Sequence, residues 1–270
     1  YVAYFRTWTG GGFRGFRTIS RAVSADMVSW SEPENMTFGA TEMEHLYTSQ
    51  THPYFRAPHI YLAFPMRFVP GCKVLSEADI SRLQVGKGYD SDCAETVFMS
   101  SRGGARYDRT LLEGFIRPGL DPGNWASRSG LSALGLVPTG REEISIYKQA
   151  HYAQPTNRLD RYTLRTDGFI SVRAPFSGGE MLTRPLRFSG DELLLNVSTG
   201  AAGSLRVEMQ DQRGKPIPGY TLDDCLPVVG DSVEKTVHWK GPDRLTGLAG
   251  QTLRLRFVMK DADLYSLRFR

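Results

Sequence analysis

Two glutamates stand where a carboxyl group could take part in acid–base chemistry. Glu143 begins an alternating segment directly after the turn at 139–140, and its neighbour Glu142 points the opposite way because side chains alternate along a strand. Glu95 stands at the start of another alternating segment. Chemistry by two carboxyl groups needs one that stays protonated and one that stays ionised. The competing interpretation is that each glutamate only pairs with a nearby arginine.

Arginine is used far more often than lysine in this chain. The sequence holds 26 Arg and 7 Lys, and residues 1–173 contain 17 of the Arg and 3 of the Lys. The planar guanidinium suits pairing with carboxylates, stacking on aromatic rings and binding of anionic substrates. An arginine-rich surface without any binding role is the alternative. Nucleic-acid binding is not expected, because the basic residues are interleaved with acidic ones and the net charge is only +4.

The composition is that of a globular chain of 270 residues, 40% of them hydrophobic. Since no apolar run approaches the roughly 18 residues of a membrane helix, no membrane partner is expected. The three cysteines are Cys72, Cys93 and Cys225. They allow at most one disulfide, and Cys72 and Cys93 flank a loop-like segment and could be joined in an exported protein. No spacing typical of a zinc site occurs, so a structural zinc site is not expected. No other metal and no cofactor are expected either.

The elements that position these groups are indicated by a repeated strand ending. An alternating strand at 19–23 runs into the turn Ser24-x-Asp26-x-x-x-Trp30. The side chains of Ser24 and Asp26 can accept hydrogen bonds from local backbone N–H groups, and Trp30 can fill the gap between neighbouring sheets. Asp26 is therefore expected to hold a turn. Weaker copies of the pattern occur at 100–109 and 162–169.

Over most of the chain, apolar and polar residues alternate with a period of two, and Gly, Pro and Asp residues separate these segments. This pattern predicts an all-β fold. Each of three blocks holds about three or four strands and ends in such a turn, which is typical of β-propeller blades. The sequence predicts propeller blades over 1–173 and a C-terminal β-sandwich over 174–270. One short helix is predicted at 75–83, with Ser76 as its N-cap.

The sequence begins with Tyr1, in a segment that already has the character of the middle of a strand. Three blades do not close a ring, because a propeller typically has four to eight. We therefore expect further N-terminal blades, in the same protein or in a companion chain, as parts of a five-bladed propeller.

Three features resemble the five-bladed propeller glycosidases of glycoside hydrolase families 32 and 43. The segment 21–30 is similar to the Ser-x-Asp-Leu-x-x-Trp blade ending of family 32. Ser-Arg-Gly-Gly at 101–104 and Arg-Thr-Asp-Gly at 165–168 take equivalent blade positions, and a predicted sandwich follows the blades. The Asn-Asp-Pro, Arg-Asp-Pro and Glu-Cys signatures of family 32 are absent from the sequence. At least one catalytic carboxylate is therefore expected outside this chain.

The resemblance implies a pocket on the propeller axis in which two carboxyl groups flank a glycosidic bond. Glu143 is the first candidate for the general acid and Glu95 the second. Sugar recognition uses aromatic faces and guanidinium forks. The candidate substrate-binding residues, each of which could equally pack between blades, are Arg6, Tyr47, His52, Tyr54, Arg67, Arg102, His151 and Tyr152.

The favoured function is a secreted or periplasmic glycoside hydrolase-like protein that acts on a polysaccharide or oligosaccharide through paired carboxylates. The abundance of arginine favours an anionic glycan. One alternative is a non-catalytic carbohydrate-binding propeller protein. Another is a sialidase-like enzyme, in which arginines bind a carboxylate and a tyrosine is the nucleophile. The turn at 24–30 argues against the sialidase, because it lacks one residue and the central glycine of sialidase turns.

Overall fold

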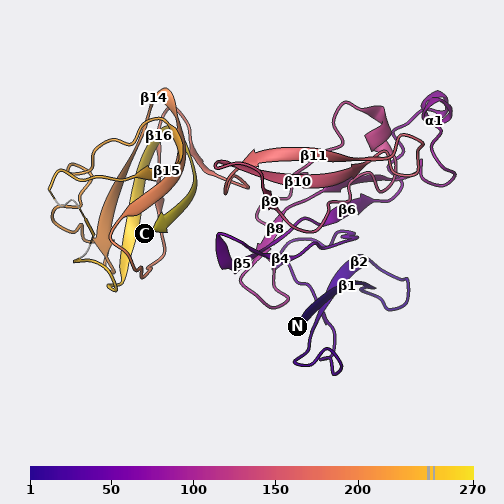
Figure 1. Cartoon of the computed structure of the whole chain (residues 1–270), viewed down its shortest axis with the longest axis horizontal. Coiled ribbons are helices and arrows are strands. Elements are labelled where there is room, and N and C mark those ends of the chain that lie inside the picture. The colour runs from indigo at the N-terminus through magenta and orange to yellow at the C-terminus, as the bar shows by residue number, and fades with distance from the viewer. Residues whose placement is uncertain (242–243, 246) are drawn as a thin grey trace. The chain divides into compact units, whose positions relative to one another are not determined.

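The computed structural model describes residues 1–241, 244–245 and 247–270. The fold is nearly all-β, with 43% strand and 4% helix, which confirms the predicted fold class. The chain divides into two compact units (Figure 1). The first unit comprises residues 1–139 and 144–163, and the second comprises 140–143 and 164–270. The division of the chain into domains at 173 and 174, and the assignment of the first part as propeller blades, stay predictions.

Small antiparallel sheets build the first unit. The first sheet has the order β1-β2-β3, with β1 at Val2–Trp8, β2 at Arg17–Val23 and β3 at Glu34–Asn35. The second has the order β4-β5-β8, with bounds His52–Tyr54, Ala57–Ala63 and Met99–Ser101. Beside it in the sequence, β6 (Met66–Val69) pairs with β7 (Cys93–Thr96). The last has the order β11-β10-β9, with bounds Arg158–Arg165, Glu143–Ala150 and Val137–Pro138.

Local hydrogen bonds form the two elements that the sequence predicted most directly. Helix α1 spans Glu77–Leu83, and Ser76 is its N-cap, with its Oγ accepting from the Asp79 N–H at 3.1 Å. In the turn after β2, the Ser24 Oγ accepts from the backbone N–H of Met27 at 2.8 Å. Asp26 Oδ1 accepts from two further backbone N–H groups at 2.8 Å, so its structural role is confirmed. A 3₁₀ helix, η1, spans Pro122–Trp125.

Trp30 does not fill a gap between sheets as predicted. Its side chain is 41% exposed, and its indole N–H donates to the Met27 carbonyl oxygen at 3.2 Å. Met27 has a left-handed φ of 64°, which turns its carbonyl toward the indole within the same turn. Trp30 therefore closes the turn locally.

Buried apolar side chains from several of the small sheets meet in one core of the first unit. Ile19 of β2, Ala63 of β5 and Met99 of β8 are buried there together with the ring of Tyr107. The Tyr107 hydroxyl is 3.0 Å from the Thr51 Oγ1, and burial raises the pKa of this phenol far above its usual value. This core holds β2 and the segment before β4 in place, and both contribute to the site described below.

The second unit contains one five-stranded sheet in the order β12-β16-β14-β15, with β13 paired to β16. Two strands are long, β14 at Leu193–Asp211 and β16 at Leu253–Phe269 (Figure 1). The others are β12 at Val172–Ala174, β13 at Gly179–Leu182 and β15 at Asp231–Thr236. Alternate residues of β14 and β16 are buried around Trp239, whose indole N–H donates to the Val207 carbonyl at 3.1 Å.

All three cysteines are free thiols. The Cys93 Sγ lies 2.9 Å from the Cys72 carbonyl oxygen, and burial raises the pKa of Cys93 to about 12. The possible bridge between Cys72 and Cys93 is thus not formed in this structure. Within the part of the chain that the structure describes, no helix is long and apolar enough to cross a membrane.

Candidate functional site

A cavity of about 720 Å³ in the first unit brings together three of the predicted binding residues, Arg6, Tyr47 and His52. Its wall is built from β1, from Ile19 of β2, from the segment that leads into β4, and from residues of β4 and β5. Both aromatic and polar side chains line it. The groups used in the argument below are Tyr4, Arg6, Tyr47, Gln50, His52 and Tyr61.

Backbone pairing fixes Tyr47 at this place. The buried Leu46 donates its N–H to the Arg17 carbonyl at 3.0 Å, and Tyr47 donates its N–H to the Met66 carbonyl at 2.8 Å. Residues 46 and 47 therefore bridge β2 and β6. On β2 and β1, the hairpin register pairs Arg17 with Trp8 across the strands. The side chains of β1, β2 and residue 47 consequently converge.

Three arginines surround the ring of Tyr47. The guanidinium carbon lies 4.7 Å from the ring centre for Arg6, 5.9 Å for Arg17 and 5.7 Å for Arg128. We refer to Arg6, Arg17 and Arg128 as the arginine cluster. Cation–π attraction of this kind contributes about 0.5–2 kcal/mol for each contact. Three positively charged side chains thus pack around the ring of Tyr47.

Further aromatic rings fix two of these side chains. The Arg17 guanidinium lies 4.6 Å from the Trp8 ring centre and 4.3 Å from that of Phe68. The guanidinium of Arg128 lies 4.9 Å from the Tyr89 ring centre and 5.7 Å from that of Tyr152. Tyr152 is a fourth predicted binding residue, and it therefore belongs to the surroundings of the arginine cluster.

None of the three arginines makes an ion pair with any residue that the structure describes. Burial lowers the pKa of Arg17, and the neighbouring charges of Arg6 and Arg128 lower it further, against an opposing effect of Tyr47 and the carboxylate of Asp92. Burial also acts to lower the pKa of Arg128, but its interactions with the surrounding tyrosines raise it overall. The cluster is therefore a concentration of positive charge compensated mainly by aromatic rings.

Several buried polar atoms at this place have no hydrogen-bond partner among the residues that the structure describes. They are the Nε atoms of Arg17 and Arg128, the Oε1 of Gln50 and the Nε2 of His52. The other ring nitrogen of His52, Nδ1, lies 2.9 Å from the Gln50 carbonyl oxygen. A buried polar group left unpaired costs about 1–3 kcal/mol, so such atoms normally bind water or a ligand. A polar ligand could form hydrogen bonds with these four atoms.

Two residues of the site have a left-handed backbone. The φ angle is 51° at Gln50 and 66° at Arg128. For residues other than glycine this conformation is uncommon and costs energy, and it is concentrated at functional positions. The fold therefore holds these two side chains in place at a cost in backbone energy.

The catalytic candidate Glu95 lies in an ion-pair cluster outside this lining. Arg67 of β6 stands directly opposite Glu95 of β7, and its Nε donates to Glu95 Oε1 at 3.0 Å. The Nη1 of Arg67 donates to Glu44 Oε1 at 2.7 Å, and Glu44 also binds Arg109. Burial acts to lower the pKa of Arg67, but the two glutamates raise it overall. The structure shows the pairing with arginine that was the alternative interpretation of Glu95, and its catalytic role stays a prediction.

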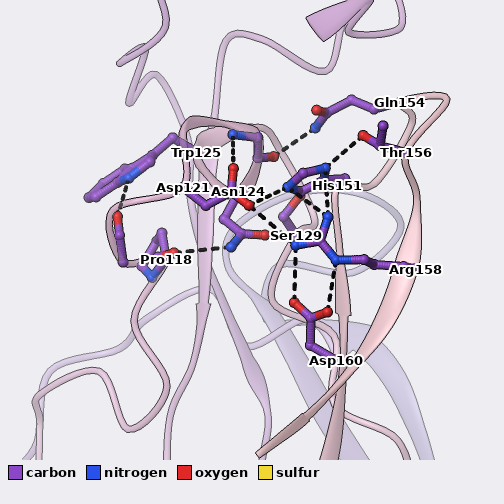
Figure 2. Close-up of polar contacts among 12 residues, drawn as sticks. Pro118, Asp121, Asn124, Trp125, Ser129, His151, Gln154, Thr156, Arg158 and Asp160 are labelled. Carbon is purple, nitrogen blue, oxygen red and sulfur yellow. Dashed lines mark hydrogen bonds and ion pairs between the residues drawn. The ribbon is translucent and has the colours of Figure 1, made fainter.

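His151, another predicted binding residue, is engaged in a separate polar network (Figure 2). Its Nε2 lies 2.8 Å from Asp121 Oδ2 and its Nδ1 lies 2.7 Å from Thr156 Oγ1. Arg158 lies beside the imidazole and donates from Nε to Asp160 Oδ1 at 2.8 Å. The network ties the loop before η1 to the start of β11. Burial acts to raise the pKa of Asp121, but hydrogen bonds from His151, the Gly123 N–H and Arg158 lower it overall.

The remaining candidates lie at three different places. Tyr54 is buried and packs edge-on against Phe55, at 4.9 Å between ring centres. Arg102 is exposed on the turn after β8. Glu143 is half-buried at the start of β10, and the turn that it ends, 140–143, belongs to the second compact unit. The roles assigned to these residues stay predictions.

Sequence reasoning missed Arg17, Gln50 and Arg128. The position of Arg17 opposite Trp8 follows from the register of the first hairpin, which the glycine-rich loop at 9–16 indicates. Gln50 and Arg128 carry no local signal. Arg128 meets Tyr47 only through the tertiary fold.

No protein-family model matches this chain, and no curated protein matches it. Among solved structures, it is similar to a glycoside hydrolase family 43 arabinoxylan arabinofuranohydrolase from Bacillus subtilis, which was solved in complex with cellotetraose. The two sequences are 11% identical and the TM-score is 0.26. The match covers 100% of this chain and 51% of that enzyme, so the chain spans about half of the enzyme's length. A TM-score this low does not establish a shared fold.

Proposed function

We propose that this chain is a carbohydrate-active protein that binds an oligosaccharide in the cavity of its first unit. The observation that carries the proposal is the composition of the cavity wall, where aromatic faces lie among amide, hydroxyl, imidazole and guanidinium groups. Aromatic faces pack against the C–H side of a sugar ring, and the polar groups bind its hydroxyls. A volume of about 720 Å³ is in the range of small-molecule sites and suits a few sugar units.

The chemistry proposed for the bound saccharide is glycoside hydrolysis through two carboxyl groups. Hydrolysis requires an acid that protonates the leaving oxygen and a carboxylate on the other side of the scissile bond. The described residues of the cavity wall supply recognition groups, so the carboxyl groups would come from outside the wall. Glu143 stays the general acid proposed from the sequence pattern. Glu95 is the weaker candidate, because it already serves as the ion-pair partner of Arg67.

A non-catalytic carbohydrate-binding protein is the second candidate function. The observation in its favour is that the groups that line the cavity are those of recognition: rings, hydroxyls, an amide, an imidazole and a guanidinium. The two candidates share the same site and differ only in whether the bound saccharide is cleaved.

A glycan panel tests the proposal. The whole chain is titrated with neutral and acidic oligosaccharides, binding is followed by calorimetry, and cleavage is followed by the release of reducing ends. Binding with release of reducing ends supports the hydrolase, and binding without cleavage supports the second candidate. If no oligosaccharide binds at millimolar concentration, the proposed function is wrong.

A further inference from the structure

We infer that the arginine cluster, Arg6, Arg17 and Arg128, is the part of the site that binds the carboxylate of an acidic saccharide, a uronic acid unit. The inference rests on the proposed function and adds the substrate class to it. Neither Arg17 nor Arg128 was among the residues expected to bind a ligand from the sequence. They are assigned by their position around Tyr47 and by the hydrogen-bonding groups that they leave unused.

The cluster gathers three arginines around one ring. Other arginines of this protein donate to carboxylates, as Arg67 does to Glu95 at 3.0 Å and Arg256 does to Glu180 at 2.8 Å. The three cluster arginines make no such pair with any described residue, although all lie within 6 Å of one tyrosine ring. Like charges that gather without an ion-pair partner repel each other, and a bound anion reduces that repulsion.

The geometry of the cluster leaves suitable donors for a carboxylate. When a guanidinium stacks on an aromatic ring, the flat face of the guanidinium makes the contact. The N–H groups of the guanidinium lie in its plane and point away from that contact. Within the described part of the chain, the buried Nε atoms of Arg17 and Arg128 have no hydrogen-bond partner. The Nη1 of Arg128 donates to the Tyr89 hydroxyl at 3.1 Å, which fixes the plane of that group. Paired N–H groups in a fixed plane match the two oxygens of a carboxylate.

The cluster is continuous with the saccharide site. Arg6 and Tyr47 belong both to the cluster and to the wall of the cavity. Arg17 and Arg128 do not line the cavity themselves, so the carboxylate of a sugar ring bound there extends past Arg6 toward them while its hydroxyls contact Gln50 and His52. The left-handed φ of 66° at Arg128 is consistent with a side chain that the fold holds at this position for a ligand.

The alternative is that the three arginines only pack against the aromatic rings. The two roles differ in what they require of a ligand. A packing role makes the protein indifferent to the charge of the saccharide, whereas a binding role makes it distinguish a carboxylate from its neutral ester.

The test compares three probes by titration calorimetry on the whole chain: a hexuronic acid oligosaccharide, its methyl ester and a neutral oligosaccharide of the same length. We expect the acid to bind at least about tenfold more tightly than the ester, because hydrogen bonds between charged partners are the strong ones. The difference should shrink as ionic strength rises.

Variants of single arginines test which side chains produce the preference for the acid over the ester. Arg6→Gln should reduce the preference for the acid to about threefold or less, and Arg6→Lys, which keeps the charge and loses the planar fork, should give an intermediate value. Arg128→Gln should act like Arg6→Gln. Arg213→Gln, an exposed arginine of the second unit, is the matched control for net charge and should leave the preference unchanged. Arg6 is itself exposed, so its variants report on binding even if Arg128→Gln fails to fold.

The outcomes separate the two proposals. Equal affinity for acid and ester in the unmodified chain overturns the carboxylate assignment and leaves the saccharide site standing. A preference for the acid that persists in Arg6→Gln and Arg128→Gln also overturns it. If none of the three probes binds, the proposed function fails and the inference fails with it.

Discussion

The guanidinium of Arg6 lies 4.7 Å from the centre of the Tyr47 ring, and this contact joins the wall of the cavity to the arginine cluster. Arg6 comes from the first strand of the chain, and Tyr47 lies where residues 46 and 47 bridge β2 and β6. The contact therefore depends on the packing of the small sheets. It makes Tyr47 the residue whose replacement should affect both parts of the site.

Replacing Tyr47 with leucine should weaken saccharide binding by about tenfold and destabilise the protein by about 1–2 kcal/mol, because three cation–π contacts and an aromatic face are lost together. Binding is measured by calorimetry and stability by urea denaturation. Tyr47→Phe keeps the ring and is the control, and it should retain most of both. An affinity that is unchanged in Tyr47→Leu would show that the saccharide does not bind here.

Breaking the Arg67 pair should cost stability. The side chains of Arg67 and Glu95 are only 18% and 19% exposed, so Arg67→Met removes the ion-pair partner of Glu95 and leaves Glu44 with Arg109 alone. We expect a loss of about 1–3 kcal/mol in urea denaturation. The double variant with Glu95→Gln should be more stable than the sum of the two single changes predicts. Simple additivity would mean that the two side chains do not interact in solution.

The turn at Ser24 should make stability depend on pH in the acid range. Backbone hydrogen bonds from Ser29 and Val28, with the hydroxyl of Ser24, lower the pKa of Asp26 to about 2. An aspartate in the unfolded chain titrates near about 3.9. Because the folded-state pKa is the lower one, the stabilisation is present above about pH 4 and is lost as the pH falls toward 2.

Urea denaturation between pH 6 and pH 2 compares the unmodified chain with Asp26→Asn. The difference between their midpoints should shrink as the acid is added. Asp223→Asn, at an exposed position of the second unit, is the control. A difference that stays constant over the whole range contradicts the account of this turn.

Glu143 can be tested against its neighbour. If Glu143 is the general acid, Glu143→Gln should lower kcat on a cleaved glycan by at least about a hundredfold, since proton transfer to the leaving group contributes about 10²–10⁴-fold. Glu142→Gln is the matched control, because residue 142 is exposed just before the strand begins. Full activity of Glu143→Gln removes this residue from the mechanism.

The features that the sequence predicted well depend on neighbouring residues. The cap of α1 and the turn at Ser24 are closed by hydrogen bonds between residues two or three positions apart, so residue types and spacing suffice to predict them. The alternation of buried and exposed residues was likewise enough to predict an all-β fold.

The features that the sequence did not predict depend on distant residues or on strand continuity. β14 continues from Leu193 to Asp211 because its pairing with β16 shifts register between Thr199 and Ser204 and then resumes. The contact between Arg128 and Tyr47 joins segments far apart in the chain. No local pattern signals it, so the arginine cluster could be recognised only in the folded protein.

The most direct test of a saccharide site at the arginine cluster is an NMR titration that follows the Nε–H signals of the arginine side chains. Adding a hexuronic acid oligosaccharide should shift the signals of Arg17 and Arg128, assigned through Arg17→Lys and Arg128→Lys, because their Nε–H groups gain a partner. The signal of Arg213 should not move. Saturating oligosaccharide that leaves the Arg17 and Arg128 signals in place would contradict the account.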